Sequence, residues 1–170
     1  MSQGLCVPSS KELDYMVYVE DIVRKTSEFM ALGRSQELLR DQIVQSNAGS
    51  ERKSLFKKYE EVIYEANSHN VRGYIVLMPK DMPLLSFEQK ECRNLSEEER
   101  DYLDEIEDEV KKTEGYLVLE SRLLSLERQI VNESEKSRLY SLLDDYEEES
   151  FKMFNLLGMQ YVARRNELHR

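Results

Sequence analysis

Much of the sequence occurs twice in the chain. When the sequence is compared with itself at an offset of 87 residues, 21 of the 66 positions from 9 to 74 are identical, without a gap. A chain of ordinary composition would give only about 4 or 5 identities over that length. The segment Ser96–Val131 carries much of the match, which indicates an internal duplication. The two halves are therefore expected to share one fold.

Apolar residues recur every three or four positions through most of the chain, which predicts helices. Few glycines, three prolines and a charged fraction of 34% also favour helix over strand. We predict an all-α protein of two tandem antiparallel helical hairpins related by duplication, either bundle-like or elongated. The hairpins belong to residues 1–85 and 86–170. The four long helices are expected at about residues 10–46, 51–78, 97–131 and 136–168.

Several residues predict where these helices begin, bend and end. Ser9 with Glu12, and Ser96 with Glu99, have the spacing of a capping box, in which each side chain bonds the backbone amide of the other. The apolar spacing breaks beside Gly115, which predicts a bend in the third helix. Gly49 is expected to adopt the left-handed conformation in the first turn. Two prolines then end the second helix and begin a linker over residues 79–95.

The charges at the two ends of the second half favour an antiparallel hairpin. Residues 97–109 contain nine carboxylates and one arginine, whereas Arg164, Arg165 and Arg170 lie near the end of the sequence. A reversal near Ser134 would place the acidic stretch beside these arginines. Exposed ion pairs contribute only a few tenths of a kcal/mol each, so they fix orientation more than stability.

The net charge of −10 is concentrated in the second half. Residues 1–85 contain 11 basic and 12 acidic residues, whereas residues 86–170 contain 13 and 22. An acidic surface repels phosphate, so we expect no direct binding to nucleic acid and none to an anionic membrane. Cys6 and Cys92 lack metal-binding spacing, and the first residues lack a signal-peptide pattern. Both observations predict a cytoplasmic protein with reduced thiols.

No motif in the sequence indicates catalysis. There is no nucleophile elbow, glycine-rich phosphate loop or zinc-ligand spacing. His69 and His169 lack the Glu-x-x-His spacing of di-metal helical bundles and are expected on the surface. Two acidic pairs have the spacing of magnesium-binding all-α hydrolases, but no basic cluster accompanies them. We therefore predict no enzymatic activity, no cofactor and no metal, and keep a carboxylate–metal hydrolase as the third hypothesis.

A Tyr-Glu-Glu triplet occurs in both halves, at residues 59–61 and 146–148. Two copies of one binding surface would explain this repetition. A simpler explanation is that each tyrosine ring is buried at the edge of the apolar stripe, with its hydroxyl in water and the glutamates solvated. We expect the simpler arrangement.

The last helix has more apolar residues than one buried face requires. Nine of the thirteen residues from 151 to 163 are apolar, where a helical face needs about three in seven. Gly158 also permits close approach of another segment. Either this helix is the centre of the bundle or one side of it binds a partner. The candidate interaction surface consists of Phe151, Phe154, Leu157, Met159, Tyr161 and Val162.

These features together predict a non-catalytic protein–protein interaction module. We expect a small cytosolic adaptor, chaperone-like binder or regulator, with another protein or a second copy of the chain as partner. The alternative is an acidic inhibitor that mimics nucleic acid and binds a basic protein. Its candidate surface consists of Glu97, Glu98, Asp101, Asp104, Glu105, Asp108, Asp144 and Glu148.

Overall fold

The computed structural model describes residues 6–77 and 94–168. Over these residues the protein is all-helical, which confirms the predicted fold class, and no strand occurs among them. The prediction of four long helices is wrong, because the first and third predicted helices are each divided in two. The helices are α1 (Ser10–Arg24), α2 (Ser27–Gln45), α3 (Ser50–Leu77), α4 (Glu97–Val110), α5 (Glu114–Asn132) and α6 (Lys136–Leu168).

Each division occurs at a threonine that ends one helix and begins the next. The hydroxyl of Thr26 donates to the carbonyl of Val23 at 2.7 Å and accepts from the amide of Phe29 at 3.3 Å. Thr113 makes the equivalent pair of bonds 87 residues later, at 2.6 and 3.4 Å. Threonine is a favourable N-cap because its hydroxyl satisfies a free amide of the first turn. The bend predicted beside Gly115 is therefore a complete break that lies just before it.

The predicted starts of α1 and α4 are confirmed. The hydroxyl of Ser9 accepts from the amide of Glu12 at 3.2 Å, and the carboxylate of Glu12 accepts from the amide of Ser9 at 2.9 Å. Ser96 and Glu99 form the same reciprocal pair, at 3.1 and 2.9 Å. Gly49 has a φ of 116°, so the turn between α2 and α3 uses the left-handed conformation as predicted.

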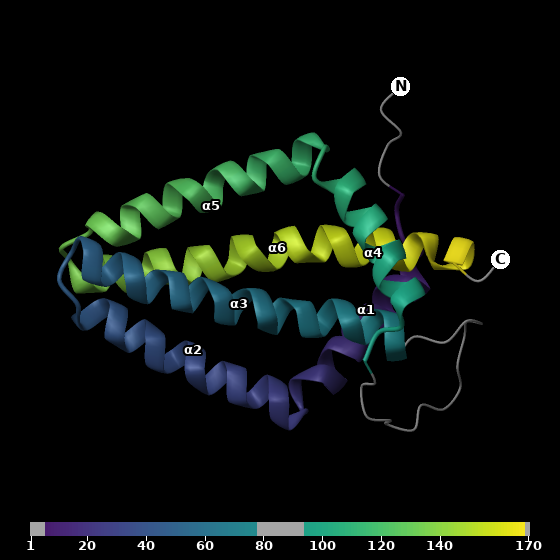
Figure 1. Ribbon diagram of the computed structural model, residues 1–170, viewed down its shortest axis with the longest axis horizontal. Helices are drawn as coiled ribbons and strands as arrows, with labels where there is room; N and C mark the ends of the chain where they lie inside the picture. Colours follow the sequence, from purple (N-terminus) through teal and green to yellow (C-terminus); the bar gives the residue numbers. More distant parts are fainter. Residues whose placement is uncertain (1–5, 78–93, 169–170) are drawn as a thin grey trace.

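The two longest helices, α3 and α6, lie side by side at the centre and run in the same direction (Figure 1). Helix α2 runs back along α3, and α5 runs back along α6. Helices α1 and α4 lie at the end opposite the α2–α3 and α5–α6 turns (Figure 1). Helix α5 occupies the bounds of α2 plus 87 residues, so the sequence offset recurs in the structure.

Two hydrophobic cores, one at each end, draw residues from both halves of the chain. The turn-end core joins α2 and α3 to α5 and α6 around Ile43, Phe56, Tyr59, Ile130, Leu139, Leu143 and Tyr146. The crossing core joins α1 and α3 to α4 and α6 around Met16, Val19, Val23, Tyr74, Ile106, Val110, Tyr161 and Val162. Several equivalent positions are buried in both halves, such as Ile43 with Ile130 and Tyr74 with Tyr161. Each half therefore covers the apolar face of the other.

Charge pairing connects α4 to the end of α6. Arg164 forms an ion pair with Glu109, as the antiparallel arrangement predicts. The side chains of Arg165 and Arg170 lie outside the described residues, as do residues 79–93 of the expected linker. None of the described helices is both long enough and apolar enough to cross a membrane.

Candidate functional site

Three adjoining cavities occupy the middle of the molecule, between the two cores. Their shared residues are Tyr64 of α3 and Phe154 of α6, whose ring centroids lie 5.1 Å apart with the ring planes at 77°. Tyr64 remains 56% exposed despite this contact. The cavities have volumes of about 640, 320 and 180 Å³, and both rings line all three of them. We call them the α2 pocket, the α5 pocket and the central pocket, and together the groove.

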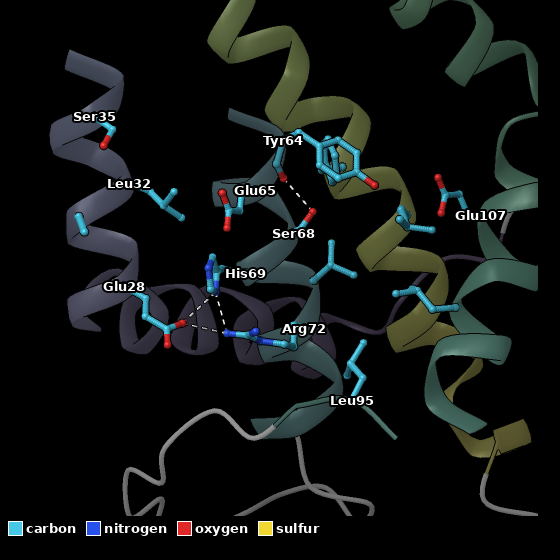
Figure 2. A pocket seen from close by; sticks show the side chains of 15 residues that line it. Glu28, Leu32, Ser35, Tyr64, Glu65, Ser68, His69, Arg72, Leu95 and Glu107 are labelled. Atoms are coloured by element: carbon cyan, nitrogen blue, oxygen red, sulfur yellow. Dashed lines mark hydrogen bonds and ion pairs between the residues drawn. The ribbon is translucent and has the colours of Figure 1, made fainter. Parts of the chain in front are cut away.

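The α2 pocket is the largest and lies between α2 and α3, reaching α4 and α6 (Figure 2). Leu32 of α2 projects into it, opposite the side chains of α3 (Figure 2). Its apolar wall consists of Ala31, Leu32, Val71, Leu95, Leu103 and Leu157. Such a wall suits the aliphatic or aromatic side chain of a ligand.

A charged cluster closes one end of the α2 pocket (Figure 2). Nη2 of Arg72 lies 2.8 Å from Nδ1 of His69 and 3.4 Å from Oε2 of Glu28. Burial and the charge of Arg72 lower the pKa of His69, while Glu28 opposes that shift. The imidazole is therefore neutral at pH 7 and accepts from Arg72. His69 was expected on the surface, yet only 12% of its side chain is exposed.

The α5 pocket lies between α3, α5 and α6 and is both aromatic and acidic. Its walls carry Ile63, Leu123, Leu124, Met153, Tyr116, Tyr146, Glu60, Glu120 and Glu127. Partial burial and the charges of Glu127 and Glu61 raise the pKa of Glu60, against the opposing effect of Lys57. Burial and the charges of Glu60 and Glu127 likewise raise the pKa of Tyr146. Negative charge is therefore concentrated beside a tyrosine ring.

The central pocket joins the other two and contains one ion pair. Lys111 lies 2.9 Å from Glu107, and the hydrogen bond to that carboxylate raises the pKa of Lys111. Tyr116 of α5 and Leu157 of α6 also line it. This pocket shares Glu107 and Leu157 with the α2 pocket, and Tyr116 and Met153 with the α5 pocket.

The groove as a whole is acidic. Among the described residues that line it, the glutamates are Glu28, Glu60, Glu65, Glu107, Glu120 and Glu127, and the basic residues are Arg72 and Lys111. Arg72 is paired with Glu28, and Lys111 with Glu107. No ion pair within residues 6–77 and 94–168 uses any of the other four glutamates. A cationic ligand is therefore favoured over an anionic one.

The six residues of the candidate interaction surface do not share one face. Phe154 and Leu157 line the groove. Tyr161 and Val162 are buried in the crossing core, at 2% and 0% exposed. Phe151 and Met159 are half-buried. The surplus of apolar residues in α6 thus serves the core and the groove at once, and binding of a partner there stays a prediction.

The candidate acidic surface falls into two places. Its six members on α4, from Glu97 to Asp108, are exposed along one helix. Asp144 and Glu148 lie on α6, about 24–30 Å along that helix from its contact with α4 at Arg164. Asp144 pairs with Arg40 at 2.7 Å and Glu148 with Lys152 at 3.4 Å. The two groups are not brought together.

The Tyr-Glu-Glu triplets differ from the expected arrangement. Tyr59 is buried as predicted, but its hydroxyl donates to Glu147 at 2.5 Å and does not face water. Glu147 also accepts from Arg40 at 2.9 Å, so it is not a solvated residue. Burial and the hydrogen bond to Glu147 raise the pKa of Tyr59. The triplets therefore hold α3 and α6 together instead of forming a simple solvent boundary.

Sequence reasoning missed Tyr64, Tyr116 and the groove glutamates other than Glu60, which belongs to a Tyr-Glu-Glu triplet. One signal was present in the repeat itself. Asn67 and Asn70 of the first half occupy the positions of Phe154 and Leu157 in the second half. Where one half has polar residues and the other half has apolar residues at equivalent positions, the two halves cannot pack in the same way.

Two further observations bear on function. No group of three His, Cys, Asp or Glu side chains is placed to hold a metal ion in the part of the chain that the structure describes. Comparison of the chain with protein-family models, curated proteins and solved structures finds no match.

Proposed function

We propose that the chain is a non-catalytic protein-interaction module whose groove binds a basic, amphipathic α-helix of another protein. The observation that carries this proposal is that the groove combines an exposed aromatic residue with an excess of glutamates. Tyr64 is 56% exposed at the point where the three pockets meet. Exposed aromatic residues surrounded by polar groups are typical of binding sites, where they act as anchors.

A helix suits this groove because it presents its apolar side chains along one face. Anchors at positions i, i+3 or i+4 and i+7 recur about every 5.4 Å of helix and fill successive pockets. The α2, central and α5 pockets adjoin one another at Tyr64 and Phe154, so successive anchors of a bound helix would enter them in turn. Basic residues at the edges of the bound helix would face Glu60, Glu65, Glu120 and Glu127, which form no ion pair with the other residues that the structure describes.

Charge also selects between possible partners. The chain carries a net charge of −10, so a second copy would bring further negative charge to an acidic groove. A basic helix is attracted to it instead, and its association rate should fall as salt increases. Self-association through another surface stays a prediction. The cytoplasm stays the proposed location, and the exposed free thiol of Cys6 fits a reducing compartment.

We also propose that the two halves descend from one duplicated unit of three helices. The matching bounds of α2 and α5 support this origin. So do the threonine caps at Thr26 and Thr113 and the capping boxes at Ser9 and Ser96. The groove then results from divergence of the copies, since most of the residues that line it differ between them.

A peptide selection tests the proposed function. Displayed helical peptides of about 18 residues, roughly 27 Å long, would be selected for binding to the full chain. We expect enriched sequences with positive net charge and apolar residues at i, i+3 or i+4 and i+7. Their binding should be lost in Tyr64→Asp but kept in Val17→Asp, a control at an exposed position of α1. Enrichment of acidic sequences, or equal binding to both variants, would reject the proposal.

A further inference from the structure

The site around Arg40, which residues of both halves form, shows which group the α5 pocket lacks. Nη1 of Arg40 lies 2.9 Å from Glu147, and its Nη2 lies 2.7 Å from Asp144. The guanidinium also stands over the ring of Tyr140, 5.9 Å from its centroid. Tyr59 completes the group by donating its hydroxyl to Glu147. A guanidinium thus fills a setting of two carboxylates and tyrosine rings between α2, α3 and α6.

The equivalent positions around the α5 pocket keep the glutamate and the buried tyrosine of this group but not its cation, and Lys57 and Lys53 replace Asp144 and Tyr140. At the offset of 87 residues, Glu60 corresponds to Glu147, and Tyr146 corresponds to Tyr59. The residue that corresponds to Arg40 is Glu127. The second half therefore places a carboxylate where the first half places a guanidinium.

The space around Glu127 is open. The α5 pocket has a volume of about 320 Å³ and is lined by Glu60, Glu120, Glu127, Tyr116 and Tyr146. Glu120 lies seven residues before Glu127, on the same face of α5, and supplies a further carboxylate. No basic residue lines the pocket among the described residues. Lys57 of α3 is the basic group that acts on Glu60, and it occupies the position equivalent to Asp144.

We propose that the α5 pocket binds the guanidinium group of an arginine side chain. The arginine is supplied by the helix of the proposed function, so its source rests on that proposal. Arginine is favoured over lysine because its planar group can bond two carboxylates and stack on an aromatic ring at the same time. Arg40 does both inside this chain. The partner's arginine then takes the place that Arg40 takes in the first half.

The direct test uses a small probe and needs no partner. Nα-acetyl-arginine amide would be titrated into the full chain while the ring resonances of Tyr116 and Tyr146 are followed by NMR. We expect saturable shifts with a dissociation constant on the order of 1 mM. The amide of citrulline, which has the same shape without the charge, should cause none. Equal shifts with both probes, or shifts confined to other tyrosines, would overturn the proposal.

A designed variant provides the second test. Glu127→Arg restores the residue type of the first half, so the chain should fill its own pocket. We expect its thermal midpoint to rise by about 2–4 °C and the arginine probe to cause no shift. Glu37→Arg, which makes the same charge change at an exposed position of α2 outside the groove, should leave the probe shifts unchanged. Unaltered probe binding in Glu127→Arg counts decisively against the site.

These outcomes separate the pocket from the proposed function. Binding of the arginine probe without binding of any basic helix would keep the pocket and reject the helix as the source. Binding of a basic helix that tolerates replacement of every arginine by citrulline would keep the module and reject the pocket.

Discussion

Arg40 of α2 lies 2.9 Å from Glu147 of α6, and this contact joins the two halves of the chain. Glu147 in turn accepts the hydroxyl of Tyr59, which is fully buried. Burial opposes the charge of Arg40, but hydrogen bonds to Asp144 and Glu147 raise the pKa of its guanidinium. These contacts therefore stabilise the charged form of Arg40.

Removal of this cation should destabilise the fold. Arg40→Met keeps the aliphatic stem but leaves Glu147 beside Tyr59 without a positive charge. We expect the free energy of unfolding to fall by about 2 kcal/mol, as for other charged hydrogen bonds that are partly buried. Urea unfolding measures this, with Arg34→Met at an exposed position of α2 as the control. Equal stability of the two variants would show that the pair contributes nothing.

The ring of Tyr74 packs so closely against Gly158 of α6 that it leaves no room for a side chain there. A Cβ at this position would lie 2.6 Å from Cε2 of that ring, which is too close for an ordinary contact. We expect Gly158→Ala to destabilise by about 1 kcal/mol, because overpacking outweighs the higher helix propensity of alanine. Gly33→Ala in α2 is the matched control, since no atom lies within 4 Å of its Cβ. That variant should gain stability, and a similar gain for Gly158→Ala would contradict the packing.

Arg52 ties together the ends of α2 and α5. Its guanidinium donates to the carbonyls of Ser46 at 2.7 Å and Ile130 at 3.1 Å, and also to that of Glu133. The equivalent residue of the second half is Leu139.

Arg52→Leu should therefore leave buried carbonyls without donors, although leucine fits the equivalent position. The expected loss is about 3 kcal/mol in urea unfolding. Arg52→Lys should recover only part of it, because an ammonium cannot reach three carbonyls in one plane. Full stability of the lysine variant would show that charge alone is needed.

Alkaline pH should unfold the protein through its buried tyrosines. Burial raises the pKa of Tyr59, Tyr74 and Tyr146 above the ordinary value of 10.0. Above that pH the unfolded chain loses these protons and the folded chain keeps them, so stability is complete below pH 10 and falls as pH rises. Each tyrosine contributes a slope of about 1.4 kcal/mol per pH unit.

Urea unfolding at pH 9, 10 and 11 measures that slope, and Tyr59→Phe should reduce it by the share of one tyrosine. Tyr18→Phe, at a position 44% exposed, is the control that removes a tyrosine hydroxyl outside the core. An identical slope in Tyr59→Phe and the wild-type chain would mean that Tyr59 titrates normally in the folded state.

The helical class and most helix ends could be predicted from the sequence because they depend on local chemistry. Ser9 and Ser96 cap their helices through residues three positions away, within reach of sequence reasoning. Thr26 and Thr113 also act locally, yet each occupies a position in the apolar stripe. Threonine fits both an apolar stripe and a helix cap, so its presence alone does not predict a break in the helix. The break depends on the contacts of the hydroxyl group.

The groove could not be predicted because it depends on how two halves of unequal sequence meet. The repeat implies equal packing along α3 and α6, and both cores follow that rule. In the middle, however, Tyr64 has Phe151 as its counterpart but contacts Phe154. Which of these rings would remain exposed is fixed by tertiary packing and not by helical periodicity.

The most direct test of the account is calorimetric titration of the tightest selected basic helix into the wild-type chain and into Tyr64→Ala. Tyr64 is 56% exposed, so its truncation should leave the fold intact. We predict at least a roughly tenfold loss of affinity in the variant, and weaker binding to the wild type as salt is raised from about 50 to 300 mM. Equal affinity for both chains, independent of salt, would contradict the proposal that this acidic groove is the binding site.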